Sequence, residues 1–216
     1  MPELRILRLY CLYHMSFSNP IDSEFTRRYS EELAMVFSAI DCVLHGDHAI
    51  YASSELSSGF RLYQALRERG LKTAAELKQS LGDDWFQANI WEVNVKAAID
   101  FSENVRGRFF DRTVVVTPAP FAARGWSQDQ YLSLWEGLLR TRIKSVWFNL
   151  NWQYSNGCAF EFAVARDAGL ETLDRRGAPL SLSAGAELIR EAAGQLERGG
   201  FDAKKLRDSL GLLQAK

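Results

Sequence analysis

The stretch Ser145-Val-Trp-Phe-Asn-Leu-Asn-Trp-Gln-Tyr-Ser-Asn-Gly-Cys-Ala-Phe-Glu-Phe-Ala-Val-Ala-Arg-Asp-Ala-Gly169 leads from an apolar strand through a polar turn into a helix. The turn holds Ser155, Asn156 and Gly157, and the pattern places Glu161 in the first turn of the helix. A helix start offers free backbone N–H groups and a positive dipole end, which suit an anion and keep a nearby carboxylate ionised. We therefore expect one small site, in which the Ser155 hydroxyl binds a ligand and the Glu161 carboxylate reacts. From the residues alone, Glu161 is equally well explained as an ordinary glutamate at a helix start.

Strand-like and helix-like segments alternate along the rest of the chain. Short apolar runs predict strands at 49–52, 113–117, 145–150 and 171–173. Helical periodicity predicts a helix that ends at Arg69, several helices within 73–106, and single helices over 127–140, 158–168, 183–197 and 202–213. This alternation predicts an α/β fold, with a Rossmann-like or flavodoxin-like parallel sheet and helices on both of its faces.

The length of 216 residues favours a single domain. The expected division is an N-terminal helical extension over 1–47 and an α/β core over 48–216. Residues 4–13 suit a strand or a short helix, and a longer helix is expected from Asp22 or Ser23 to about residue 43. We interpret this extension as a packing or dimerisation element.

Two further loops follow predicted strands, at the strand ends where ligands bind in open α/β sheets. The loop 53–59 carries the hydroxyls of Ser53, Ser54 and Ser57, which is the layout of a phosphate or ribose cradle. Serines also cap helices in many proteins, so a purely structural role stays open. The second loop contains Pro120 and Phe121.

Composition excludes several classes of partner. The formal net charge of -1 gives no general attraction to a nucleic acid polymer or to an anionic membrane. No apolar run reaches the length of a membrane-spanning helix. The three cysteines and three histidines show no metal-ligand spacing, and the unpaired cysteines suggest a reducing, cytoplasmic environment.

The segment Ser155-Asn-Gly-Cys-Ala-Phe-Glu161, followed by Ala163, Ala165 and Gly169, resembles the signature of the nucleoside 2-deoxyribosyltransferase-like superfamily. The run from Tyr51 to Ser54, together with Gly59, is similar to the family's first strand and its phosphate and ribose loop. The run from Thr117 to Pro120 is similar to the end of its second strand. The resemblance covers about residues 48–175, whereas 1–47 and 71–112 depart from the smallest family members.

The resemblance implies a role for Glu161 as the nucleophile that attacks the anomeric carbon, forms a glycosyl ester and releases the base. Transferases of the family tend to carry Asp at the position of Ser155. A serine there is similar to the branch that hydrolyses nucleoside 5'-monophosphates, because a hydroxyl suits a phosphate and a carboxylate repels it. Ser53, Ser54 and Ser57 would complete such a pocket.

The departing base needs a general acid and a slot. The family places an Asp on the helix before its third strand, where this chain offers Glu136 and Asp129. By spacing, Glu136 is nearer to the family position. The aromatic candidates for the slot, each of which is more often a packing residue, are Phe121, Trp126, Trp152 and Tyr154.

We therefore expect an enzyme that cleaves the N-glycosidic bond of a small nucleotide or nucleoside, with no cofactor and no metal. The resemblance also implies a homo-oligomer, since family sites often borrow residues from a neighbouring subunit. Two alternatives stay open: a deoxyribosyltransferase that exchanges bases, and a non-catalytic nucleotide-binding or sensor module.

Overall fold

The computed structural model describes residues 23–44, 49–109, 113–121, 123, 125–214, and for 23–30 the backbone alone. It divides the chain into two compact units, Met1–His45 and Gly46–Lys216. The described part of the first unit is the helix α2 (Ser23–Leu44), which confirms the helix expected there. The expected strand or helix over 4–13, with Cys11 and the three histidines, lies outside the described residues.

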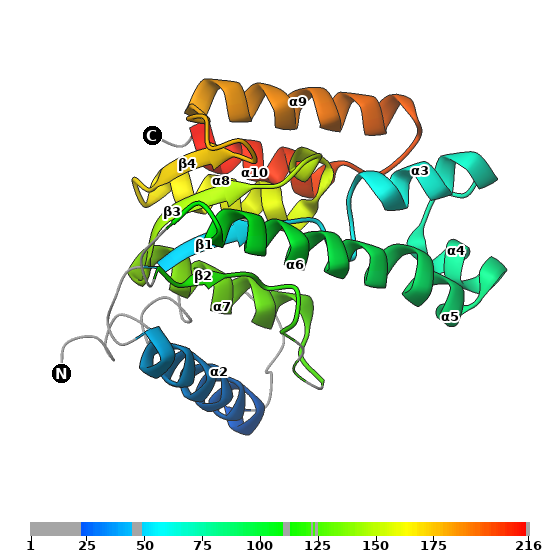
Figure 1. The fold of residues 1–216 in the computed structure, drawn as a ribbon. Coiled ribbons are helices and arrows are strands. Elements are labelled where there is room, and N and C mark those ends of the chain that lie inside the picture. The colour runs from blue at the N-terminus through cyan, green and yellow to red at the C-terminus, as the bar shows by residue number, and fades with distance from the viewer. Residues whose placement is uncertain (1–22, 45–48, 110–112, 122, 124, 215–216) are drawn as a thin grey trace. The chain divides into compact units, whose positions relative to one another are not determined.

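The second unit is built on a four-stranded sheet, with the order β2-β1-β3-β4. Its strands are β1 (Ala49–Ser53), β2 (Val115–Val116), β3 (Ile143–Phe148) and β4 (Glu171–Asp174). All three strand pairs are parallel, and helices flank the sheet (Figure 1). This confirms the predicted α/β class, and the arrangement is consistent with a Rossmann-like or flavodoxin-like fold.

β2 is shorter than the predicted strand 113–117. It lies at the edge of the described sheet, where β1 is the only described strand that pairs with it. Pro118 has no N–H group to extend the ladder, and the chain turns at this point, with the N–H of Phe121 donating to the Pro118 carbonyl at 3.0 Å.

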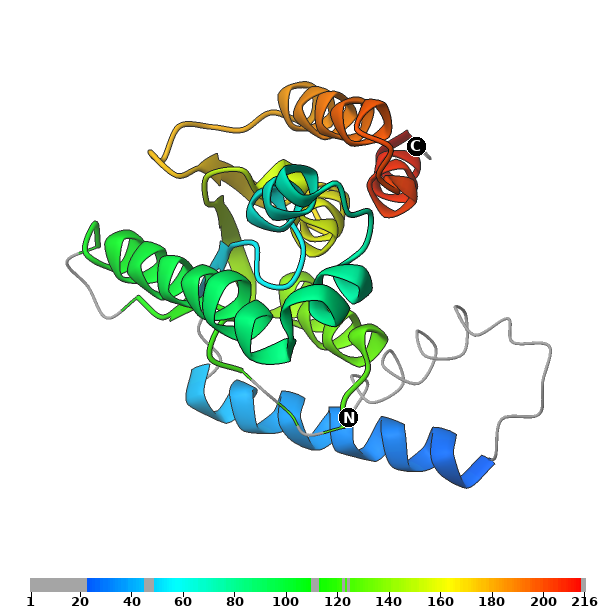
Figure 2. The same cartoon turned by 90° about the vertical axis from the view of Figure 1, so that its right-hand side faces the viewer.

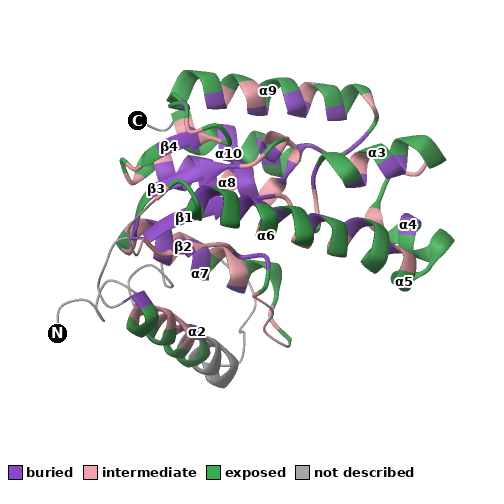
Figure 3. Cartoon of the chain, viewed as in Figure 1, coloured by how far each residue is buried: buried purple, intermediate pink, exposed green. Residues whose placement is uncertain are grey.

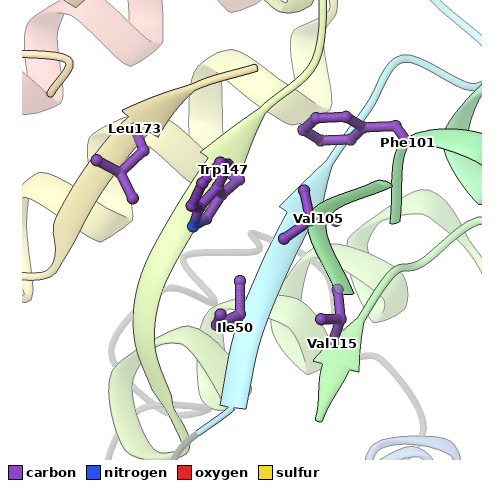
Figure 4. Packing of buried hydrophobic residues seen from close by; sticks show 7 residues of the cluster. Ile50, Phe101, Val105, Val115, Trp147 and Leu173 are labelled. Atoms are coloured by element: carbon purple, nitrogen blue, oxygen red, sulfur yellow. The ribbon is translucent and has the colours of Figure 1, made fainter. Parts of the chain in front are cut away.

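One face of the sheet packs against α6 (Glu92–Arg106). Alternate residues of a strand point to the same face, so Ile50 and Ala52 of β1 lie together on this side. Figure 4 shows the strand side chains directed at Phe101 and Val105 of α6. The buried cluster consists of Ile50, Ala52, Phe101, Val105, Val115, Trp147 and Leu173.

The opposite face is covered by α7 (Gln128–Thr141) and α8 (Asn156–Asp167). Tyr51 and Ser53 of β1 point to this face, and the Tyr51 ring lies 6.1 Å from that of Trp135 on α7. Two further helices, α9 (Leu182–Arg198) and α10 (Lys204–Gln214), pack on α8 (Figures 1 and 2). The strands and the inner side of α8 form the buried centre of this unit (Figure 3).

Between β1 and β2 the chain forms several helical segments before it reaches α6. They are α3 (Phe60–Arg69), α4 (Ala74–Leu81), α5 (Asp83–Phe86) and the π-helical turn η1 (Gln87–Trp91). Thr73 and Ser127 cap α4 and α7, because their hydroxyls accept the N–H groups of Glu76 and Gln130. Asp83 is the first residue of α5, which Gly82 precedes.

Candidate functional site

A pocket of about 710 Å³ lies beyond the carboxyl ends of β1 and β3. In the order β2-β1-β3-β4, the chain leaves β1 towards β2 on one side and later returns to β3 on the other. Such a switch point leaves a crevice in which α/β proteins bind ligands. The walls come from the loop after β1, the loop after β2, and residues of η1, α7, α8 and α10.

Glu161 is the buried carboxylate of this pocket, with a relative exposure of 5%. The Tyr51 hydroxyl donates to its Oε1 at 2.7 Å, and the Ser53 hydroxyl donates to its Oε2 at 2.6 Å. Each oxygen therefore has its own donor from β1, and the two bonds fix the plane of the carboxylate.

The expected position of Glu161 in the first turn of its helix is wrong. Ser155 is the N-cap residue and α8 begins at Asn156, two residues earlier than predicted, so Glu161 lies in the second turn. The Asn-Gly pair, expected to be part of a loop, adopts helical geometry instead. The field of the helix dipole is strongest in the first turn, and Glu161 lies beyond it.

The pKa of Glu161 is raised to about 7. Burial is the main cause, because it penalises the charged form, while the hydrogen bonds from Ser53 and Tyr51 lower the pKa. The expectation of a carboxylate held ionised by a helix start is therefore replaced by one that changes protonation near neutral pH.

Two neighbours of Glu161 stay uncharged. Burial and the nearby Glu161 carboxylate raise the pKa of Tyr51 well above its usual value. The same two causes raise the pKa of Cys158, although Ser53 and Ser155 lower it. The buried Cys158 is therefore an unreactive thiol.

The start of α8 forms a second part of the pocket wall, with Ser155, Asn156 and Gly157. The Ser155 side chain is buried but makes no capping hydrogen bond. The N–H of Asn156 donates to the Ser58 hydroxyl at 3.3 Å, which joins this helix start to the loop after β1.

The loop after β1 lines the pocket with Ser54, Leu56, Ser57 and Ser58. The hydroxyl of Ser54 is buried and has no hydrogen-bond partner in the described structure. A buried hydroxyl without a partner costs about 1–3 kcal/mol, so this atom is well suited to a ligand that supplies the missing bond.

Hydrogen bonds made by two polar side chains, Glu55 and Asn94, stabilise the same loop. Glu55 accepts the N–H of Phe60 at 2.7 Å, and burial raises its pKa to about 7. Asn94 of α6, which is 2% exposed, donates to the carbonyl of Leu56 at 2.7 Å and accepts from Nε of Arg61 at 3.1 Å. The pocket wall is thereby fastened to α6 and to the start of α3.

Of the two residues considered as the general acid, one lines the pocket and the other does not. Asp129, in the first turn of α7, lines the pocket. Glu136 does not line it, and its Oε1 accepts from Nε of Arg140 at 2.9 Å. Spacing along the sequence favoured Glu136, but of these two carboxylates the pocket wall includes Asp129.

Of the aromatic residues considered for the base slot, some line the pocket and others do not. Phe121 lines the pocket, whereas Pro120 is exposed outside it. Trp152 lies in the core, with its ring 4.6 Å from Phe148 and 5.0 Å from Phe162. The structure therefore places Trp152 in the packing of α8 and not in a base slot. Trp126 and Tyr154 are likewise outside the pocket.

Several residues of the pocket wall were missed from the sequence. Phe160 could have been found, because it precedes Glu161 and shares a helix face with Asn156. Trp91 is in the π-helical turn, a feature that no periodicity argument predicts. The face of α10 with Lys205 and Asp208 is brought in from the far end of the chain, and no local pattern indicates it.

No family model, no curated protein and no solved structure matches the chain. The described residues contain no group of three or more histidine, cysteine, aspartate or glutamate side chains that could hold a metal ion. None of the described helices is both long and apolar enough to cross a membrane. The chemistry of the pocket therefore rests on its own geometry.

Proposed function

We propose that the protein cleaves the N-glycosidic bond of a nucleoside 5'-monophosphate or a closely related nucleotide through a covalent glycosyl ester on Glu161. The observation that carries this proposal is the Glu161 carboxylate. It is buried, it faces a pocket of ligand size, and each of its oxygens is held by one hydroxyl of β1. A carboxylate oriented in this way suits attack on a carbon atom, because little reorganisation is needed.

In the first step, an oxygen of ionised Glu161 forms a bond to the anomeric carbon, and the carbon–nitrogen bond to the base breaks. The bonding electrons leave with the base, and a proton from an acid neutralises the base nitrogen. In the second step, water attacks the same carbon, the ester bond breaks and the carboxylate is restored. The proton of that water returns to the acid, so the protein ends unchanged.

Asp129 is the acid that the pocket favours. It is a carboxyl group on the wall of the pocket, on the helix from which the resemblance implies the acid. Glu136 is a poorer choice because it does not line the pocket and its Oε1 already accepts from Nε of Arg140 at 2.9 Å.

The proposed preference for a phosphorylated substrate is based on the pocket wall formed by the loop after β1 and the start of α8. Three donors belong to this wall: the unpartnered hydroxyl of Ser54, the hydroxyl of Ser155, which makes no capping hydrogen bond, and the N-terminal end of α8. Together they offer hydroxyl and N–H groups to an anion, whereas an aspartate at position 155 would repel the anion.

The test is base release from a panel of nucleoside 5'-monophosphates and the matching nucleosides, measured by chromatography. The wild-type protein is expected to release base from at least one monophosphate, and Glu161→Gln to lower kcat by about a thousandfold or more while nucleotide binding remains. Asp129→Asn is expected to lower kcat, and Glu136→Gln is the control that keeps it.

The same panel separates the alternatives. If added acceptor bases are converted into new nucleosides, the protein is a transferase. If nucleotides bind but the wild-type protein releases no base from any of them, the sensor alternative replaces the enzyme.

The oligomeric state and the cellular location remain predictions, the first from the resemblance and the second from the composition. A homo-oligomer is expected, which light scattering of the purified protein checks. A cytoplasmic location is expected from the cysteine pattern, and cell fractionation checks it.

A further inference from the structure

One face of α10 forms a wall of the pocket. The residues that reach it are Lys205, Asp208, Ser209 and Leu212, at the spacing of neighbours on one side of a helix. α10 packs on α8, the helix that carries Glu161. The C-terminal helix therefore belongs to the site and not only to the scaffold.

The charges on the pocket wall are unequal. Among the described residues, the acidic side chains that line it are Asp129, Glu161 and Asp208, and the only basic one is Lys205. Asp208 is already paired, since Nζ of Lys204 lies 2.7 Å from its Oδ2. A ligand with two negative charges would meet repulsion in this pocket unless Lys205 faced it.

Lys205 differs from the basic residues beside it. Lys204 pairs with Asp208, and Arg207 donates to both carboxylate oxygens of Glu197, at 2.9 and 2.7 Å. The ammonium of Lys205 has no ion pair or hydrogen bond within the described part of the chain. Its charge is thus available to a ligand, and its exposed, flexible stem lets it reach over the pocket edge.

We propose that Lys205 is a specificity-determining residue, which supplies the positive charge that makes the pocket prefer phosphorylated ligands. This inference rests on the proposed function for the identity of the ligand. Ser54 and the start of α8 provide neutral donors, and a phosphate dianion needs a cation as well. Because Lys205 is exposed, its contribution is moderate and is screened by salt.

The experiment measures the dissociation constant of each nucleoside 5'-monophosphate and of its matching nucleoside by calorimetry, with Glu161→Gln as the background to prevent turnover. Lys205→Gln is expected to weaken monophosphate binding by about tenfold at low salt and by less at high salt, with nucleoside binding unchanged. Lys205→Arg keeps the charge and is expected to retain most of the affinity. Lys144→Gln, an exposed lysine of β3 outside the pocket, is the matched control.

An equal change for the phosphorylated and unphosphorylated ligands, or no change for either, overturns the role of Lys205. So does the absence of any nucleotide binding to the protein. If monophosphates bind and depend on Lys205 but the wild-type protein releases no base, the proposed function fails while the inference about Lys205 stands.

Discussion

Glu161 combines two opposing influences at the scale of a single residue. Burial favours its neutral form, and two hydroxyl donors favour its charged form. The balance leaves its pKa at about 7, well above the value of 4.5 in an unfolded chain. The nucleophile role that we propose needs the ionised form, and a buried charge is costly, so that role would be kept at the expense of stability.

Replacement of Glu161 by Gln is expected to stabilise the protein above neutral pH. Below about pH 4.5 the residue is neutral in both states and the gain is small. Between about pH 4.5 and 7 the unfolded chain loses the proton while the native protein keeps it, so wild-type stability falls as pH rises. Above pH 7 the gain levels off at roughly 3 kcal/mol.

Urea unfolding of wild-type protein and variant at several pH values measures this difference. Glu103→Gln, which removes an exposed carboxylate from α6, is the control and is expected to show no such trend. A stability difference for Glu161→Gln that stays constant with pH would contradict the raised pKa.

The pairing of Ser155 with Glu161 in one site was visible in the sequence, because both residues belong to one local motif. The protonation of Glu161 was not predictable in the same way. It depends on burial and on hydrogen bonds from Tyr51 and Ser53 of β1, a strand that is distant along the chain. Short motifs predict proximity better than they predict the surrounding polarity.

At the scale of elements, the helical segment between β1 and β2 contributes to the pocket wall and to its support. Its π-helical turn η1 ends at Trp91 on the pocket wall, and the helix that follows carries Asn94. Turns of this rare kind occur often at functional sites. The segment therefore also supports the loop after β1.

Asn94→Leu is expected to loosen that loop. The substitution leaves the partly buried Leu56 carbonyl and the Arg61 side chain without this partner, at a cost of about 1 kcal/mol in the free energy of unfolding. Hydrogen exchange of the amides in 55–60 measures the local effect and is expected to accelerate more than exchange in β3.

Asn89→Ala is the matched control. Its side chain donates to the Trp85 carbonyl, on the same helical segment and exposed to solvent. An Asn94 variant in which exchange of the loop remains as slow as in the wild-type protein would show that the loop holds itself in place.

Most element types followed from the sequence, and the bounds shifted by up to about two residues. Caps were predictable where a side chain forms the bond, as at Ser127. β2 was overestimated because its valines resemble a central strand, while the edge position and Pro118 limit it to two residues. Edge position is a property of the sheet order, which local residues do not encode.

At the scale of the whole molecule, every residue of the pocket wall belongs to the unit Gly46–Lys216. The parallel α/β class was predictable from the alternation of strands and helices. The participation of α10 was not, because it depends on how the last helix packs on α8.

Removal of residues 1–45 is expected to leave a chain that unfolds cooperatively and binds the same ligands. The unit that remains has its own sheet and its own buried cluster. Circular dichroism during heating and ligand calorimetry measure the two properties. Loss of a cooperative transition in the shortened chain would show that the first unit is needed for folding.

The hydroxyl-held carboxylate has a consequence for how the pocket exchanges protons with the solvent. A group with a pKa of about 7 is partly protonated at neutral pH. An anion bound beside it makes the charged form less favourable, so the pocket takes up a fraction of a proton as the anion enters. A positively charged group bound beside it has the opposite effect and releases that proton. The affinity of the pocket for a charged ligand thus depends on pH, and binding of that ligand in turn changes the protonation of Glu161.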